Sequence, residues 1–175
     1  MSSDYEIADG FRIFTMMYQA DKKCHEAMFG IARANFTVGR FENAEQWLVL
    51  AYQNEKDLAY RVWLGYTYME MYKRLPRINP RKLKFAKYAV KNLSRCAKDK
   101  HFGLYANFGL LYLSTQVHLE KQEKEVAGMR SPAEYATDIK KLYSSSKVQY
   151  EGYLAWAYCY LYTEEGKEKL GIKVL

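Results

Sequence analysis

The sequence predicts an all-α protein. Apolar side chains return every three or four residues along most of the chain, as between Met28 and Phe36 and between Leu48 and Tyr52, and this is the period of one helix face. No long stretch alternates apolar and polar residues as a half-buried strand does. Helix breaks coincide with a glycine or with a capping residue before proline. We therefore expect about seven to nine helices and no strand.

Size and composition fit one ordered domain, residues 1–175. The chain is 49% hydrophobic and 27% charged, so it has enough apolar surface to offset the entropy lost on folding. It has only three prolines and ten glycines, and no low-complexity linker. The first charged residues are acidic, unlike a secretory signal, and no segment approaches the roughly 18 apolar residues of a spanning helix. We expect a soluble, intracellular, cytoplasmic protein without a membrane span.

Stop signals separate the first predicted helices. Residues 3–20 form one helix, and its apolar face carries Ile7, Phe11, Phe14 and Tyr18. Gly39 can adopt the left-handed conformation that ends a helix. A further helix then runs from Phe41 to Tyr52 after a turn of a few residues. Together these signals predict a helical hairpin.

Two later helices have clear starts. Asn79 precedes Pro80, and Ser131 precedes Pro132. Each pair places a capping side chain before a proline at the first helical position. Glu134 adds a capping box with Ser131. We predict helix starts at both prolines.

A small residue after a bulky apolar one recurs along the chain. The recurring residues are Ala32, Gly65, Gly109 and Ala155, and in the last three copies a tyrosine follows at the third position, namely Tyr68, Tyr112 and Tyr158. The spacings are 33, 44 and 46 residues. They fit a unit of about 34 residues with insertions near residues 72–82 and 118–132.

This pattern resembles the tetratricopeptide repeat (TPR), a helix–turn–helix unit. In the stretch GRFENAEQWLVLA, Gly39 would turn the chain, Phe41 would fill the joint, and small alanines would let the helices approach. The resemblance implies a right-handed α-solenoid of antiparallel helix pairs, with three to four TPR-like units and long insertions in units two and three. The implied parts are a preceding helix 1–22, unit one 25–57, unit two 58–100, unit three 101–146 and a partial unit four 147–175.

Stacked units of this kind form a concave groove lined by the first helix of each unit. At the expected register the inward-facing residues are Phe29, Arg33, Phe36, Val62, Tyr66, Met69, Glu70, Asn107, Leu110, Ser114, Trp156 and Tyr160. The partner-binding groove is predicted to consist of Phe29, Arg33, Tyr66, Glu70, Asn107, Trp156 and Tyr160. Rigid aromatics with a few polar groups suit the capture of a peptide. For any single aromatic, burial in the core is the more frequent role.

Positive charge is concentrated between Lys73 and Lys100. This stretch holds eleven basic residues against the single acid Asp99, and the chain's net charge is +7. The predicted basic surface is one helix face, made of Lys84, Lys87, Lys91, Arg95 and Lys98. Such a face is often simply solvated. As a functional surface it would attract an acidic protein, a nucleic-acid backbone or an anionic membrane. We favour an acidic protein, because few aromatics accompany the charges to stack on bases.

Catalysis and metal binding are not expected. The sequence has no G-x-S-x-G, phosphate-binding P-loop, G-x-G-x-x-G or H-E-x-x-H motif. Three cysteines and three histidines are scattered, without a C-x-x-C pair. We expect buried cysteines, no catalytic residue, no metal ligand and no cofactor.

The leading hypothesis is a non-catalytic scaffold or adaptor that binds a peptide or protein segment in its groove, within a larger assembly. An alternative is a small TPR chaperone for a hydrophobic client, of the type III secretion class. A third is binding of nucleic acid or an anionic surface by the basic helix 82–98. The aromatic segment after residue 150 also favours self-association, or continuation of a longer solenoid through the C-terminal helix.

Overall fold

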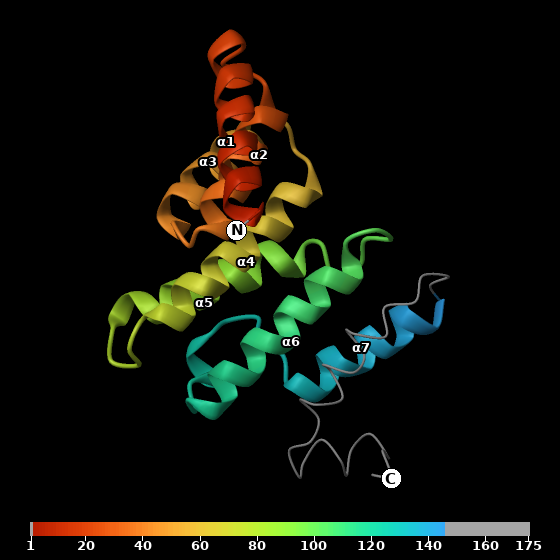
Figure 1. The fold of residues 1–175 in the computed structure, drawn as a ribbon. Helices are drawn as coiled ribbons and strands as arrows, with labels where there is room; N and C mark the ends of the chain where they lie inside the picture. Colours follow the sequence, from red (N-terminus) through yellow and green to blue (C-terminus); the bar gives the residue numbers. More distant parts are fainter. Residues whose placement is uncertain (1, 146–175) are drawn as a thin grey trace. The chain divides into compact units, whose positions relative to one another are not determined.

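The computed structural model describes residues 2–145, and within them the chain is entirely helical (Figure 1). The elements are α1 (Ser2–Ala20), α2 (His25–Thr37), α3 (Phe41–Asn54), α4 (Leu58–Arg74), α5 (Pro80–Ser94), α6 (Gly103–Leu119), the short 3₁₀ helix η1 (Glu123–Glu125) and α7 (Pro132–Ser145). The prediction of an all-α fold is confirmed for these residues. No helix among them is both long and apolar enough to cross a bilayer.

The chain divides into two compact units. The first is Met1–Asn92, and the second begins at Leu93. The sequence predicts a single domain. No linker marks this boundary, because it falls inside α5.

In the first unit, α1 packs on α2, α2 on α3 and α3 on α4. Gly30 on α2 makes the first of these contacts possible, because a Cβ at this position would lie 2.3 Å from the ring of Phe14 on α1. Further along α1, the rings of Tyr18 and Trp47 meet edge to face at 4.9 Å. The predicted apolar face of α1 is thus used for packing, although Phe11 stays 41% exposed.

The turn between α2 and α3 is built around Gly39. Its φ of +77° is the left-handed conformation predicted for this glycine. The last turn of α4 holds the same loop, because Nη1 of Arg74 donates a hydrogen bond to the Gly39 carbonyl at 2.8 Å. The Arg74 guanidinium also covers the ring of Phe41 at 4.2 Å. Arg74, counted above in the basic run, therefore has a structural role.

Helix α4 joins α3 to α5 through Tyr68. Its hydroxyl donates to Oε1 of Glu45 on α3 at 2.6 Å, and its ring packs on Phe85 and Tyr88 of α5. Burial raises the pKa of the Tyr68 phenol above its ordinary value. Pro80 begins α5 as predicted, with Oδ1 of Asn79 accepting the next free backbone N–H.

The second unit contains α6 packed on α7. Ser131 and Glu134 form the predicted capping box, with Glu134 accepting from the Ser131 backbone N at 2.9 Å and Ser131 Oγ accepting from the Glu134 N at 3.4 Å. Asp99 organises the approach to α6, since its Oδ1 accepts the backbone N–H groups of His101 and Phe102, each at 2.8 Å. Apolar residues of both helices are fully buried, including Leu111 and Ile139.

The recurring small residues have similar places in their helices. Ala32 is the eighth residue of α2, Gly65 the eighth of α4 and Gly109 the seventh of α6. All three are buried. The fourth, Ala155, lies outside the described residues.

The contact between Gly30 and Phe14 predicts an asymmetric response to alanine. Gly30→Ala will lower the free energy of unfolding by about 1–3 kcal/mol, because the new methyl overlaps the Phe14 ring. Gly10→Ala will be neutral or stabilising by about 0.5–1 kcal/mol, because a Cβ on Gly10 of α1 meets nothing within 4 Å. Urea unfolding followed by circular dichroism compares the two. Equal stability of the two variants would show that α1 does not pack this way.

Candidate functional site

Three half-buried aromatic rings from α2 and α4 lie together in the first unit. Phe29 and Phe36 are seven residues apart on α2, about two turns, and share one face. Trp63 of α4 contacts both, with ring centroids 6.0 Å from Phe29 and 5.2 Å from Phe36. We call Phe29, Phe36 and Trp63 the α2–α4 aromatic face. Each ring keeps part of its surface in solvent, which aromatic residues at binding sites commonly do.

Arg33 lies over this face. Its guanidinium carbon is 5.3 Å from the centroid of Trp63 and 5.8 Å from that of Phe29. The side chain is exposed. Both distances fit cation–π attraction, which favours a planar guanidinium above an aromatic ring. The structure thus brings together Phe29 and Arg33, two of the predicted groove residues.

Trp63 is the residue that the sequence-based groove missed. The expected register selected Val62 instead, but Val62 is buried, at 6% exposure. One residue turns a helix by about 100°, so a register error of one exchanges a core position for a surface position. The sequence did offer one signal: Trp63 is a bulky aromatic residue on α4, and α2 carries two phenylalanines, Phe29 and Phe36, on one face.

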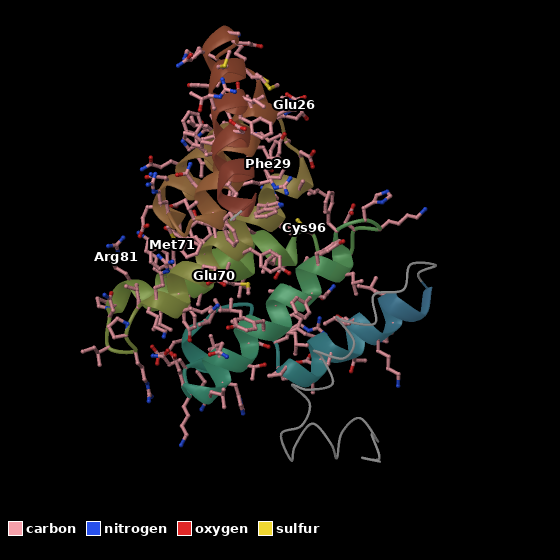
Figure 2. The ribbon with its side chains drawn as sticks, in the orientation of Figure 1. Glu26, Phe29, Glu70, Met71, Arg81 and Cys96 are labelled. Carbon is pink, nitrogen blue, oxygen red and sulfur yellow. The ribbon has the colours of Figure 1, made fainter. Side chains whose placement is uncertain are left out.

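The other groove residues have varied positions. Tyr66 and Glu70 are half-buried on α4. Glu70 pairs with Lys73 at 2.9 Å (Glu70 is labelled in Figure 2, with Phe29).

Met69, Leu110 and Ser114 are core residues with exposures of 3% or less, so their predicted place in the groove is wrong. Trp156 and Tyr160 lie outside the described residues.

One end of the aromatic face is fixed by a polar contact. Nδ1 of His25 on α2 and the hydroxyl of Tyr60 on α4 are 2.7 Å apart. The Tyr60 ring also packs on Phe29, with centroids 4.9 Å apart. Burial, followed by the nearby carboxylate of Asp57, raises the pKa of Tyr60 to about 12. The neutral phenol therefore persists at physiological pH and links the two helices.

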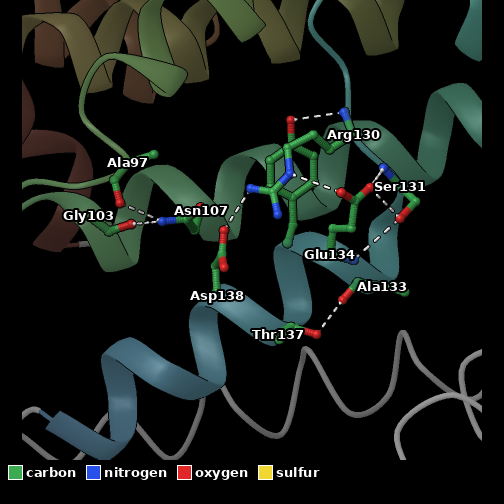
Figure 3. A network of polar contacts seen from close by, with 10 residues as sticks. Ala97, Gly103, Asn107, Arg130, Ser131, Ala133, Glu134, Thr137 and Asp138 are labelled. Atoms are coloured by element: carbon green, nitrogen blue, oxygen red, sulfur yellow. Dashed lines mark hydrogen bonds and ion pairs between the residues drawn. The ribbon is translucent and has the colours of Figure 1, made fainter.

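Asn107 is buried, with 1% exposure. Its Nδ2 donates to the backbone carbonyls of Ala97 and Gly103, each at 2.8 Å (Figure 3). This fixes the turn before α6. The amide oxygen has no hydrogen-bond partner among the described residues. Asn107 therefore supports the backbone of the second unit, and with 1% exposure it offers almost no surface to a partner.

A polar network surrounds the start of α7 (Figure 3). Arg130 donates to Asp138 at 2.7 Å and to Glu134 at 3.4 Å, and its guanidinium lies 5.1 Å from the ring centroid of Tyr135. The hydrogen bond to Asp138 raises the pKa of the Arg130 guanidinium, and burial raises that of Tyr135. The bond from the Ser131 backbone lowers the pKa of Glu134. These groups fasten the preceding loop to α7.

A cleft of about 420 Å³ adjoins this network. Its lining residues are Ser94, Ala97, Lys98, Asn107, Leu110, Gly128, Arg130, Tyr135, Asp138, Lys141 and Leu142. Its volume is that of a small-molecule site. Arg130, one of the cations in this lining, already pairs with the carboxylates of Glu134 and Asp138. Its guanidinium is therefore not free to bind a charged ligand in the cleft.

The predicted basic surface is only partly one helix face. Lys84, Lys87 and Lys91 are exposed on α5. Helix α5 ends at Ser94, and the following turns use i to i−3 hydrogen bonds, as from Cys96 N to the Leu93 carbonyl at 2.9 Å. The expectation of a basic helix 82–98 is therefore wrong at its C-terminal end. Arg95 and Lys98 are exposed but follow the helix.

The N-terminal end of that basic helix also differs from expectation. Lys82 is 4% exposed. Its Nζ donates to the Leu75 carbonyl at 3.0 Å and lies 4.4 Å from the ring centroid of Tyr72. The side chain closes the loop before α5, because a buried ammonium needs a hydrogen-bond acceptor. Lys82 does not belong to a surface for partners.

Reactive groups are sparse where the structure describes the chain. No cluster of three or more His, Cys, Asp and Glu side chains suitable for a metal ion is present among the described residues. Cys96 is buried as predicted, whereas Cys24 is half-buried, and Cys159 lies outside the described range. The shifted pKa values described above all have structural causes in capping, ion pairing or burial.

No protein-family model matches this sequence, and no curated protein and no solved structure matches it. The resemblance to tetratricopeptide repeats therefore depends on the residues of this chain alone. The strongest of these are Ala32, Gly65 and Gly109, at similar positions in α2, α4 and α6.

The capping box predicts how acid affects stability. The pKa of Glu134 is lower in the folded state, so its carboxylate stabilises the fold above the unfolded-state value, and this contribution is lost as the pH falls through the folded value. Glu134→Gln will therefore lose less stability than the parent between about pH 5 and pH 3. Urea unfolding across this range measures the difference.

Glu42→Gln is the matched control for this experiment. Glu42 is an exposed glutamate in the first turn of α3, without a hydrogen bond or ion pair to any described residue. It should leave the acid profile of the parent unchanged. An acid profile of Glu134→Gln identical to that of Glu42→Gln would remove the assigned role of Glu134.

Proposed function

We propose that this protein is a non-catalytic helical-repeat scaffold, or adaptor, that binds an extended segment of another protein on the α2–α4 aromatic face within a larger assembly. The observation that carries the proposal is the group of three half-buried rings, Phe29, Phe36 and Trp63, with Arg33 exposed across them. Such rings offer a large contact area at a small cost in side-chain entropy. One stacked cation adds direction to that contact.

The order of the helices along the chain supports this role. The helix pairs α2–α3, α4–α5 and α6–α7 correspond to the three full units implied by the TPR resemblance, and their first helices carry the recurring small residues. We propose that these pairs are TPR-like repeats in a right-handed solenoid. In such an arrangement α2 and α4 are successive first helices, the elements that line a concave binding surface.

Two other functions remain as alternatives to be tested. A chaperone for a hydrophobic client would use a broader apolar surface than one group of rings. Binding of nucleic acid or another polyanion would use the exposed lysines of α5, Lys84, Lys87 and Lys91, and would weaken steeply with salt. The aromatic face favours a peptide, because rings and a single cation recognise individual side chains.

The test is selection of short random peptides, with blocked termini, on the immobilised full chain. Selected peptides should bind Trp63→Leu roughly tenfold or more weakly, because loss of a central aromatic anchor commonly costs over 2 kcal/mol. Leucine retains an apolar contact for Phe29 and Phe36, and circular dichroism confirms folding. Fluorescence anisotropy of the labelled peptides measures the affinities.

The double variant Lys87→Glu/Lys91→Glu is the matched control. It changes exposed residues of α5 and should leave peptide affinity close to that of the parent. If selected peptides bind Trp63→Leu as well as the parent, the aromatic face is not the binding site. If binding is lost only in the lysine variant and DNA is retained by the parent, the polyanion alternative replaces the proposal.

A further inference from the structure

Arg33 is an exposed cation whose guanidinium contacts aromatic rings but has no hydrogen-bond or ion-pair partner among the described residues. Its guanidinium lies over two rings, 5.3 Å from the centroid of Trp63 and 5.8 Å from that of Phe29. It makes no hydrogen bond or ion pair with any residue that the structure describes. An arginine stacked on an aromatic surface has less freedom to lose on binding, and its planar N–H fork stays available at the edge.

Two other charged side chains of α4 already have hydrogen-bond partners within the protein. Glu70 accepts from Nζ of Lys73 at 2.9 and 3.0 Å. Arg61 donates from Nε to the hydroxyl of Tyr52 at 2.8 Å and covers that ring at 4.4 Å. Both contacts satisfy charge or hydrogen-bonding capacity within the protein. Arg33 differs from both, since its guanidinium donates no hydrogen bond to any described residue.

A guanidinium in this state selects a carboxylate. Arginine donates two parallel hydrogen bonds to a carboxylate, and such charge-assisted pairs are the strong ones in proteins. A partner that covers the rings would also exclude water from Arg33. A covered cation without an acceptor would then cost free energy, so the partner has to bring the acceptor with it.

The rings on both sides of Arg33 specify where the acid lies in the partner. Along α2, Phe29 precedes Arg33 by roughly 6 Å and Phe36 follows it by roughly 4.5 Å, at 1.5 Å per residue. In an extended peptide, side chains two residues apart point the same way and are roughly 6.6–6.8 Å apart. A central acid opposite Arg33 therefore places apolar side chains near Phe29 and near Phe36.

We infer that the α2–α4 aromatic face recognises an extended, internal segment of an acidic protein, with the pattern apolar-x-(Asp or Glu)-x-apolar, and that Arg33 binds the central carboxylate. This inference rests on the proposed function and names the chemistry of its partner. A chain end would leave one of the two flanking rings uncovered, so the carboxylate belongs to a side chain and not to a C-terminus.

The test uses a peptide library with five randomised central positions, an acetylated N-terminus and an amidated C-terminus. The parent chain should enrich Asp or Glu at the middle position and apolar residues two positions away on each side. Replacing the central Asp by Asn in an enriched peptide should weaken binding about tenfold, which corresponds to the lower range for hydrogen bonds to charged groups. Added salt should weaken the Asp peptide more than the Asn peptide.

A charge exchange isolates the contact. Arg33→Glu should reject the Asp peptide and bind its Lys counterpart, because the two charges are simply interchanged. Arg33→Lys should keep the acid preference with lower affinity, since an ammonium lacks the paired N–H geometry. Arg81→Gln is the matched control, because Arg81 is also exposed and stacked, 5.6 Å from the ring centroid of Phe85, but on α5.

The outcomes separate this inference from the proposed function. Two results would overturn the carboxylate assignment and leave the binding face intact. One is a set of peptides that depend on Trp63 but bind equally well with Asp or Asn at the centre. The other is an Arg33→Glu variant that does not bind the Lys peptide. A second library with free C-termini tests the other source of a carboxylate. If only this library yields peptides that depend on Trp63 and Arg33, the bound carboxylate is a C-terminus and not an internal side chain. Absence of any peptide that depends on Trp63 would overturn both.

Discussion

The contact of α2 with α4 through Phe29, Phe36 and Trp63 is the interaction on which the rest of the account depends. It joins two helices separated by α3 in the sequence and leaves part of each ring in solvent. The His25–Tyr60 contact strengthens the same junction at 2.7 Å. The contact therefore has two roles, since the rings that hold the helices together also form the surface we propose for a partner.

Helix boundaries set by local chemistry were predictable from the sequence. Pro80 and Pro132 begin helices because proline fixes φ near the helical value, and its missing N–H has no partner in the first turn of a helix. Gly39 follows the end of α2 because it tolerates a positive φ. Residues whose role depends on a distant partner could not be predicted. Arg74 and Lys82 look like members of a basic run, yet each binds a backbone carbonyl in a loop.

The binding face was predictable only in part, and the reason is geometric. Phe29 and Arg33 follow from the period of α2, but the choice between Val62 and Trp63 depends on the rotation of α4, which spacing alone does not fix. Asn107 shows a related limit. Its amide Nδ2 donates to the carbonyls of Ala97 and Gly103. The turn before α6 that presents these carbonyls forms only when the chain is folded.

Fluorine NMR of the full chain labelled with 5-fluorotryptophan tests the central claim most directly. The chain has three tryptophans, and Trp47, packed on Tyr18 of α1, is an internal reference. Saturation with a selected peptide should shift the Trp63 resonance and leave that of Trp47 in place, because the peptide covers only the α2–α4 aromatic face. An unchanged Trp63 resonance at saturation would contradict the account.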